Sequence, residues 1–216
     1  MLDNMIFDLY LIRHGESEAN ACPDKMGQKA DVKLTATGKH QAELLRQHFL
    51  ARNYTFDYIY SSPYDRTVAT ARIIFEDSPI IYAPELVEYD AGDWTDHSRS
   101  ATINDDIRLK MGYQNMGFRP PNGESMNMVE RRVSKWLDEE ILYNKDKLEY
   151  LYGLDKPLEI AAVSHGMTIK SVLHYVMGFD KSFLWKVDIG NTSVTKISYG
   201  NNGWRLRFIN NTSHLE

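Results

Sequence analysis

The sequence predicts an α/β fold in three layers, with helices on both faces of a mostly parallel sheet and an antiparallel edge. Strand-like and helix-like runs alternate along most of the 216 residues, which is typical of parallel sheets. The strand-like runs are mostly apolar, as expected for strands that are buried on both faces. Two runs near the C-terminus, 193–199 and 204–209, flank a Gly-Asn-Asn-Gly turn and predict a hairpin at the sheet edge.

The individual elements follow from apolar spacing and from capping residues. We expect strands at residues 6–12, 58–60, 80–82 and 158–163. Thr35 has the side chain of an N-cap, and apolar residues follow it at helical spacing. Ser62 and Pro63 are expected to begin a second helix. Apolar stripes predict a long amphipathic helix over residues 129–141 and another over residues 169–177.

Length and composition indicate one domain that spans residues 1–216. The chain is 43% hydrophobic, which is an ordinary value for a globular protein, and it is long enough to bury a core. Residues 91–123 are rich in Gly, Asn, Asp and Pro, with only a weak helical stretch near residues 107–111. We interpret them as an irregular insertion within that domain, beside the expected substrate pocket.

Charge and targeting signals limit the classes of partner. The net charge is −5 and no basic block occurs, so a nucleic-acid partner is not indicated. No apolar run approaches the roughly 18 residues of a membrane span. The acidic N-terminal start argues against a secretory signal, and the single cysteine, Cys22, favours a reducing compartment. We therefore expect a cytoplasmic protein, whose oligomeric state the sequence does not determine.

Two histidines and an arginine, residues that could hold an anion, follow predicted strands. Arg13-His14-Gly15 ends the first strand, and Ser164-His165-Gly166 ends the fourth. Ligands in open α/β sheets bind beyond the carboxyl ends of the strands, where helix N-termini favour anions. Arg66 follows the second strand and, together with Arg13, could hold phosphate oxygens through bidentate contacts.

The same residues could also have purely structural roles, in packing or in surface ion pairs. A single Arg-His-Gly at a strand end is a weak signal, and five other histidines lack that context. Arg66 could simply pair with a carboxylate such as Asp65 or Glu85. The pair of His-Gly junctions together with Arg66 favours a functional site.

Several motifs together resemble the histidine phosphatase superfamily, also called phosphoglycerate-mutase-like proteins, over nearly the whole chain. Their order along the sequence matches the family's order. The motifs are Leu11-Ile12-Arg13-His14-Gly15-Glu16-Ser17 with Asn20, Leu34-Thr35-Ala36-Thr37-Gly38 with Gln41-Ala42, Ser61-Ser62-Pro63 with Arg66, Thr67, Thr70 and Ala71, Leu86-Val87-Glu88 with Gly92 and Trp94, Gly123-Glu124-Ser125, and Val163-Ser164-His165-Gly166.

The resemblance implies a role for each matching residue. His14 would be the nucleophile and become phosphohistidine, while Arg13, Arg66 and His165 complete the phosphate pocket. Asn20 matches a position that also lines this pocket. Glu88 matches the family's proton donor, with Glu85 as the rival carboxylate. His14 must stay unprotonated to attack, which the nearby arginines favour, as would His165 if it were protonated.

The resemblance also implies a metal-independent phosphomonoester hydrolase that needs no cofactor and acts on a small molecule. No HxxxH motif or carboxylate cluster suggests a metal. The alternatives are mutase-type transfer, which is an isomerase reaction, and a non-catalytic phosphate-binding module.

Two departures from the classical mutases favour hydrolysis. Glu88 is followed by Tyr89 rather than arginine, and the basic residues of the insertion are scattered, namely Arg99, Arg108, Lys110 and Arg119. Trp94 is followed by Thr95-Asp96 where many phosphatase members have an acidic residue and glycine, which leaves the pocket entrance undetermined. Four aromatic residues could either contact a substrate tail or pack the fold, namely Tyr89, Trp94, Tyr113 and Phe118.

Overall fold

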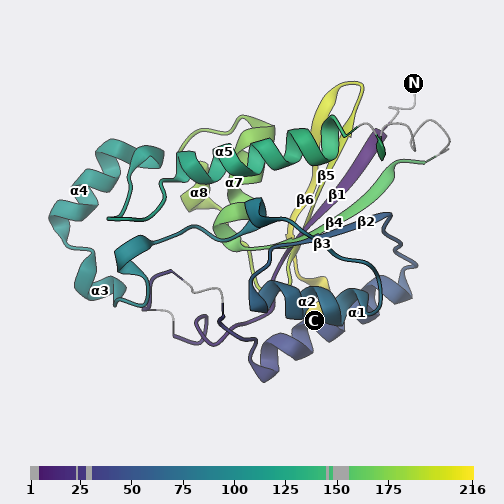
Figure 1. Cartoon of the computed structure of the whole chain (residues 1–216), viewed down its shortest axis with the longest axis horizontal. Coiled ribbons are helices and arrows are strands. Elements are labelled where there is room, and N and C mark those ends of the chain that lie inside the picture. The colour runs from purple at the N-terminus through teal and green to yellow at the C-terminus, as the bar shows by residue number, and fades with distance from the viewer. Residues whose placement is uncertain (1–4, 23, 28–30, 145, 148–155) are drawn as a thin grey trace.

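A computed structural model describes residues 5–22, 24–27, 31–144, 146–147 and 156–216 (Figure 1). Within these ranges, six strands form one sheet in the order β3-β2-β4-β1-β5-β6. The first four strands of that order are parallel, whereas β5 runs antiparallel to β1, and β6 antiparallel to β5. The mostly parallel sheet with an antiparallel edge is confirmed. The strands are β1 Met5–Arg13, β2 Tyr58–Ser61, β3 Ile81–Tyr82, β4 Leu158–Ser164, β5 Val194–Gly200 and β6 Gly203–Asn211.

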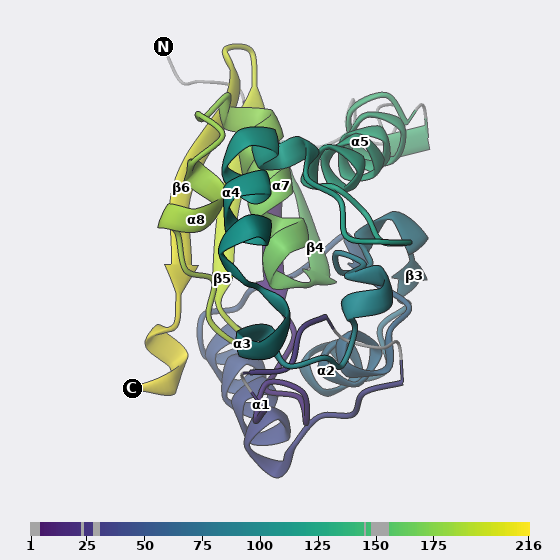
Figure 2. The ribbon, with the colours of Figure 1, turned by 90° about the vertical axis from the view of Figure 1, so that its left-hand side faces the viewer.

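Helices cover both faces of the sheet. Figures 1 and 2 show α1 and α2 on one face, with α5 and α7 on the other. The short helices α3, α4 and α8 lie towards one end of the molecule (Figure 1). The helices are α1 Ala36–Ala51, α2 Asp65–Phe75, α3 Arg99–Thr102, α4 Asp105–Gln114, α5 Met126–Trp136, α7 Gly166–Met177 and α8 Phe183–Lys186.

The two helical layers meet opposite faces of β1. Phe7, Leu9 and Leu11 point into the core cluster that α5 and α7 complete. Tyr10 and Ile12 alternate with them and join the cluster built by α1 and α2. Successive side chains of a strand face opposite sides, so a strand between two cores is mostly apolar. This explains the mostly apolar run of β1 and confirms the three layers. Asp8 interrupts that run and pairs with Lys196 at 2.6 Å.

The predicted start of the second helix is wrong by about two residues. α2 begins at Asp65, with Tyr64 as its N-cap, and no side chain caps it. The Ser62 amide still follows the sheet, because it donates to the Val163 carbonyl oxygen at 2.9 Å. Its hydroxyl lies 2.9 Å from the His165 ring nitrogen Nε2. Ser62 therefore belongs to the site at the sheet end.

The insertion at residues 91–123 is also more regular than predicted. α4 extends over ten residues, and its N-cap Asn104 accepts from the Ile107 amide. Ser98 caps α3 in the same way. Neither helix buries a residue, so the apolar stripe that reveals most helices is weak here. The capping residues Ser98 and Asn104 are the sequence features that indicate these two helices.

The long helix predicted over residues 129–141 changes its winding near its end. α5 ends at Trp136, and Leu137–Leu142 continues as a π-helix. Leu137 and Ile141 remain buried in the core on that segment. The predicted apolar face is therefore correct, although the regular helix is shorter. That residues 1–216 form a single domain stays a prediction.

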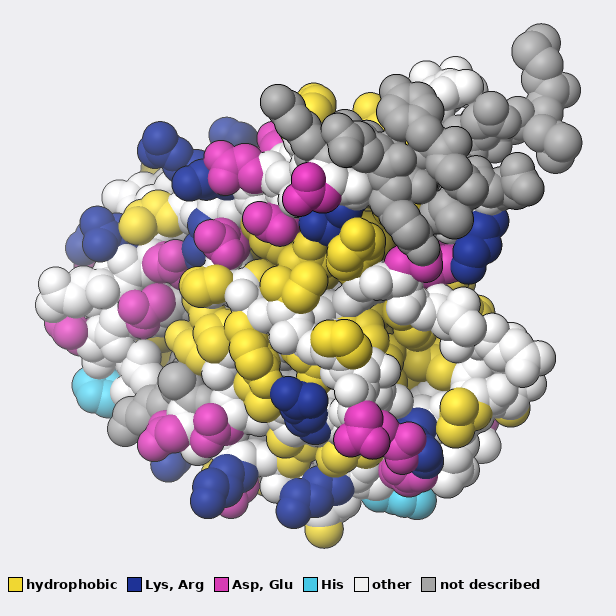
Figure 3. Space-filling model, turned by 45° about the vertical axis from the view of Figure 1, so that its right-hand side comes forward, with side chains coloured by type: hydrophobic (Ala, Val, Ile, Leu, Met, Phe, Trp, Pro, Cys, Tyr) yellow, Lys and Arg dark blue, Asp and Glu magenta, His cyan; other side chains and the backbone are white. Residues whose placement is uncertain are grey.

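The β3 edge of the sheet is short and exposed. Ile81 and Tyr82 keep 42% and 45% of their surface accessible. In the space-filling view, hydrophobic side chains gather in a band across the middle of the visible face, with charged side chains near its borders (Figure 3). Among the described residues, no helix is long and apolar enough to cross a membrane.

Two glycines let the end of β1 approach the start of α1. A Cβ atom on Gly15 would collide with the Gly38 carbonyl group, and one on Gly38 would collide with the Glu16 backbone. We predict that Gly38→Ala lowers the free energy of unfolding by about 2 kcal/mol, because the backbone must move apart. Urea denaturation measures this change.

A matched control is Gly112→Ala in α4, where a Cβ atom meets nothing within 4 Å. That change should leave stability equal or raise it by up to about 1 kcal/mol through helix propensity. Equal losses in the two variants would contradict the close-approach argument.

Candidate active site

The pairing of β1 with β4 brings the two predicted histidines together. The parallel register matches Arg13 with Ser164, so His14 and His165 follow at the same sheet end. The His14 amide donates to the Ser164 carbonyl oxygen at 3.0 Å. The two imidazole rings lie 5.2 Å apart, centroid to centroid. Both side chains are buried.

Arg66 connects the two rings. It lies in the first turn of α2, and its side chain is fully buried. Its Nε lies 3.3 Å from His14 Nε2, and its Nη2 lies 3.1 Å from His165 Nδ1. The guanidinium also lies over the Tyr64 ring, 5.0 Å from the centroid. Arg66 therefore contacts both imidazoles.

These contacts select one neutral tautomer for each histidine. Arginine only donates, so the two ring nitrogens that it contacts must accept. His14 Nδ1 lies 2.7 Å from the Gly15 carbonyl oxygen and must donate its proton there. The Nε2 lone pair of His14 therefore faces Arg66. His165 carries its proton on Nε2, which donates to the Ser62 hydroxyl.

Burial and positive charge keep both rings neutral. Burial, then Arg66 and Arg13, hold the pKa of His14 well below its usual 6.5, and the Gly15 carbonyl opposes them only in part. Burial, then Arg66 and His14, hold the pKa of His165 well below 6.5 in the same way. A protonated His165, one option considered from the sequence, is therefore not the state of this unliganded site.

Arg13 and Arg66 supply buried positive charge. Burial lowers the pKa of Arg66 to about 10, so it stays protonated at neutral pH. Burial also lowers the pKa of Arg13. Arg13 Nη1 donates to the Ile189 carbonyl oxygen at 2.6 Å, whereas its buried Nε has no hydrogen-bond partner among the described residues. A buried donor without a partner is costly, and a bound anion would satisfy it.

Glu88 brings a carboxylate to this site. The Tyr89 amide donates to Oε1 at 2.9 Å, and the Met167 amide at the start of α7 donates to Oε2 at 3.4 Å. The negative charge of Glu88 raises the pKa of both Arg13 and Arg66, against the effect of their burial. The rival Glu85 does not have this effect on either arginine. The geometry therefore favours Glu88 as the acid.

Arg132 of α5 fixes the segment that carries Glu88. Its Nε and Nη2 each lie 3.0 Å from a carboxylate oxygen of Glu124. Its Nη1 donates to the Glu85 carbonyl oxygen at 2.6 Å, and its Nη2 to the Glu88 carbonyl oxygen at 3.2 Å. The Glu124 residue of the Gly-Glu-Ser motif thus acts on the site through Arg132.

Asn20 shapes the loop after His14. Its Oδ1 accepts from the Ser17 amide and hydroxyl, and from Asn191 Nδ2, each at 3.1 Å. Asn191 Nδ2 also lies 3.0 Å from the His14 carbonyl oxygen, and the Thr192 amide donates to that oxygen at 3.3 Å. Asn191 and Thr192 were not identified from the sequence, because their contact with His14 joins segments that are 177 residues apart at Asn191.

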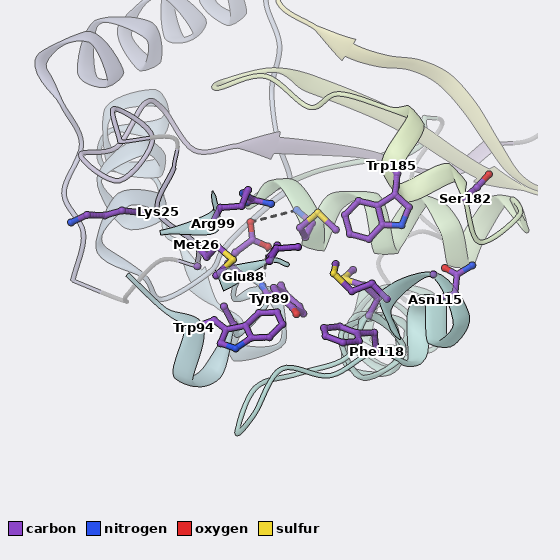
Figure 4. A pocket seen from close by; sticks show the side chains of 17 residues that line it. Lys25, Met26, Glu88, Tyr89, Trp94, Arg99, Asn115, Phe118, Ser182 and Trp185 are labelled. Carbon is purple, nitrogen blue, oxygen red and sulfur yellow. Dashed lines mark hydrogen bonds between the residues drawn. The ribbon is translucent and has the colours of Figure 1, made fainter. Parts of the chain in front are cut away.

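A cavity of about 470 Å³ adjoins the phosphate site (Figure 4). It is lined by Lys25, Met26, Gly27, Glu88, Tyr89, Ala91, Trp94, Arg99, Ile103, Met111, Gly112, Asn115, Phe118, Met126, Met167, Ser182 and Trp185. Three of the four aromatic residues named from the sequence lie in this wall. The fourth, Tyr113, is 85% exposed and outside it. Trp185 was not identified from the sequence.

The basic residues of the insertion do not converge. Only Arg99 among them lines the cavity. Lys110 pairs with Asp106 at 2.8 Å, and Arg119 donates to the Gly123 carbonyl oxygen. Within the described ranges, no group of three or more His, Cys, Asp or Glu side chains is placed to hold a metal ion.

The fold and the paired histidines define the class of histidine phosphatases. The sequence profile of the histidine phosphatase superfamily, branch 1, matches residues 9–212. The chain belongs to this superfamily and is an enzyme of the phosphatase class. The probable phosphoglycerate mutase GpmB of Yersinia pestis is 30% identical over 220 residues, which cover 98% of this chain and 96% of that protein.

Solved structures of phosphatases share the fold over the whole length. Phosphoserine phosphatase of Entamoeba histolytica, solved with 3-phosphoglyceric acid, has a TM-score of 0.82 and 27% identity, covering 98% of this chain and 100% of that one. A putative α-ribazole-5′-phosphate phosphatase of Escherichia coli has a TM-score of 0.76 and 26% identity, covering 96% and 97%. The phosphoglycerate-mutase-like fold is confirmed.

The hydrogen bonds predict opposite tautomers for the two buried histidines. We expect His14 to carry its proton on Nδ1 and His165 on Nε2, with both rings neutral between pH 8 and pH 6 in phosphate-free protein. Nitrogen-15 NMR of the ring nitrogens measures this, with His14→Ala and His165→Ala used to assign the signals. A ring that gains a proton above pH 6 would contradict the analysis.

Proposed function

We propose that this chain hydrolyses phosphomonoesters through a phosphohistidine on His14, without a metal or another cofactor. One observation carries the proposal: the unprotonated Nε2 of His14 faces the buried Arg66, and Arg13, whose charge also acts on His14, has a buried donor without a partner among the described residues. A phosphoryl group in this position would have a nucleophile on one side and cations on its oxygens. These are the requirements of phosphoryl transfer.

In the first step, His14 Nε2 attacks phosphorus and the bond to the ester oxygen breaks. The proton stays on Nδ1, hydrogen-bonded to the Gly15 carbonyl oxygen, and this bond stabilises the positive charge that develops on the ring. Arg13 and Arg66 stabilise the equatorial oxygens, which carry most of the charge. His165 donates to Ser62 in the free site and would need to turn or gain a proton to donate to phosphate.

Glu88 is proposed as the proton donor to the leaving oxygen. A phosphate dianion beside a carboxylate favours its protonated form, so substrate binding would prepare the acid. In the second step, ionised Glu88 would take a proton from water, and the resulting nucleophile would cleave the phosphohistidine. The products are an alcohol and inorganic phosphate, and the free enzyme is restored.

Hydrolysis is favoured over mutase transfer by the character of the cavity. A mutase must hold a second phosphate, whereas among the described lining residues only Lys25 and Arg99 are cationic, and both are exposed. The 30% identity to a probable phosphoglycerate mutase keeps the isomerase as the second candidate. The two reactions are distinguished by incubating the protein with 3-phosphoglycerate and a bisphosphate primer and measuring the products. A phosphatase releases inorganic phosphate, whereas a mutase forms 2-phosphoglycerate.

The third candidate is a phosphate-binding module without catalytic activity. It is disfavoured because His14, Glu88 and His165 are all retained and come together. We propose a small-molecule phosphomonoester as the partner, with neither nucleic acid nor membrane. A cytoplasmic location stays a prediction.

His14 should carry an acid-labile, base-stable phosphoryl group during turnover. Rapid quenching with a labelled substrate, followed by peptide mapping at alkaline pH, locates the label. His14→Ala should lose both the label and the release of phosphate. Label on a serine, or full activity in His14→Ala, would refute the proposal.

Glu88→Gln should slow cleavage most where the leaving group is poor. Loss of a general acid typically costs about 10²–10⁴-fold, so hydrolysis of an alkyl phosphate should nearly stop. Para-nitrophenyl phosphate should phosphorylate His14 at a much less reduced rate, since nitrophenolate leaves without a proton. Single-turnover rates are needed, because Glu88 also serves the second step.

Glu85→Gln is the matched control, three residues away on the same segment. Its rates should stay close to those of the parent protein with both substrates. If Glu85→Gln shows the leaving-group pattern and Glu88→Gln does not, the acid is Glu85 and the phosphohistidine step still stands.

A further inference from the structure

The cavity beside the phosphate site is placed to receive the leaving group. Glu88 is the only carboxylate among the described residues of its wall, and its charge acts on Arg13 and Arg66. Met167, another lining residue, follows His165 by two positions at the start of α7. A phosphoryl group held by the arginines would therefore direct its ester substituent past Glu88 into the cavity.

The cavity wall is mostly apolar and aromatic. Trp94 and Phe118 lie in contact, with ring centroids 5.6 Å apart. In Figure 4, these two rings lie on one side of the pocket and Trp185 lies on another. Four methionines also line the cavity, namely Met26, Met111, Met126 and Met167. Methionine is flexible and its sulfur makes favourable contacts with aromatic rings.

Trp185 has no evident structural role that would explain its position. It lies on α8, a helix of four residues, and 61% of its surface is exposed. The neighbouring Leu184 is fully buried and anchors the helix. A large aromatic residue left exposed in the wall of a cavity offers a face on which a planar group can stack.

Charge in the wall does not favour a carboxylated leaving group. Lys25 and Arg99 are both exposed, and Lys25 points away from the centre of the pocket in Figure 4. Apart from Glu88, Asn115 and Ser182, the rest of the described wall is mostly apolar, and a carboxylate placed against that apolar part would lose its hydration without a partner. A ring, by contrast, would remove apolar surface from water on both partners.

We propose that this cavity selects phosphomonoesters whose leaving group carries an aromatic ring, held between Trp185 and the Trp94–Phe118 pair. This inference rests on the proposed phosphatase function and extends it to the substrate class. It predicts poor use of esters whose leaving group is small and charged, such as glycerate or serine.

The test compares two esters of equal chemical reactivity, 2-phenylethyl phosphate and propyl phosphate. Both have a primary alcohol as the leaving group, so a difference in kcat/KM measures the effect of the phenyl ring. We expect kcat/KM to be about 10- to 100-fold higher with the phenyl group, the range for burying such a side chain. Trp185→Ala should lower this ratio several-fold, whereas Tyr113→Ala, outside the cavity, should leave it unchanged.

A ratio near one, or a higher kcat/KM for 3-phosphoglycerate and phosphoserine than for 2-phenylethyl phosphate, would overturn the inference and leave the phosphatase function intact. Calorimetric binding of both alkyl esters to His14→Ala gives a readout that needs no turnover. If no ester is hydrolysed but the phenyl compound binds at least 10-fold more tightly, the ring site stands and the function fails. If neither is hydrolysed and both bind equally, both proposals are wrong.

Discussion

The parallel pairing of β1 with β4 is the constraint on which the site depends. Because Arg13 is matched with Ser164, the next residue of each strand is a histidine, and the two imidazoles leave the sheet side by side. A slip of one residue would turn every side chain to the opposite face and exchange the two cores. The cores on both faces of β1 therefore hold the catalytic geometry in register.

Buried positive charge is the main electrostatic feature of the sheet end. Arg13 and Arg66 are taken out of water beside two neutral imidazoles, and this arrangement costs stability. Carbonyl oxygens and the charge of Glu88 offset the cost only in part. Such an arrangement is typical of functional sites, where the missing interaction is supplied by the ligand. A phosphate dianion would supply it here.

The packed layers and the insertion at residues 91–123 supply different parts of the site. The ends of β1, β2 and β4 and the start of α2 hold the side chains of the candidate phosphate site inside well-packed layers. Residues 91–123 contribute α3 and α4, which bury no residue of their own. The segment as a whole, including Trp94 and Phe118 outside these helices, forms much of the cavity wall. Glu88 lies between the two parts and is tied to α7 directly and to α5 through Arg132. Glu88 is thus held by the packed layers while it lines the cavity beside the insertion.

The sequence by itself determined the sheet, its layers and the identity of the main site residues. Alternating apolar runs reflect burial on one or two faces, and that signal is local. The His-Gly junctions at strand ends gave His14 and His165, and Arg66 followed from its place after the second strand. In the insertion, α3 was missed and α4 was expected only as a weak helical stretch, because both bury little. The start of α2 was misplaced because Ser62 is used elsewhere.

Only the tertiary structure decided how these groups act together. The tautomers depend on contacts of Arg66 with residues 52 and 99 positions away. The roles of Asn191, Ser62 and Trp185 likewise depend on segments that meet only in the folded chain. Hydrogen-bond direction and desolvation are properties of the packed neighbourhood, and sequence spacing carries no record of them.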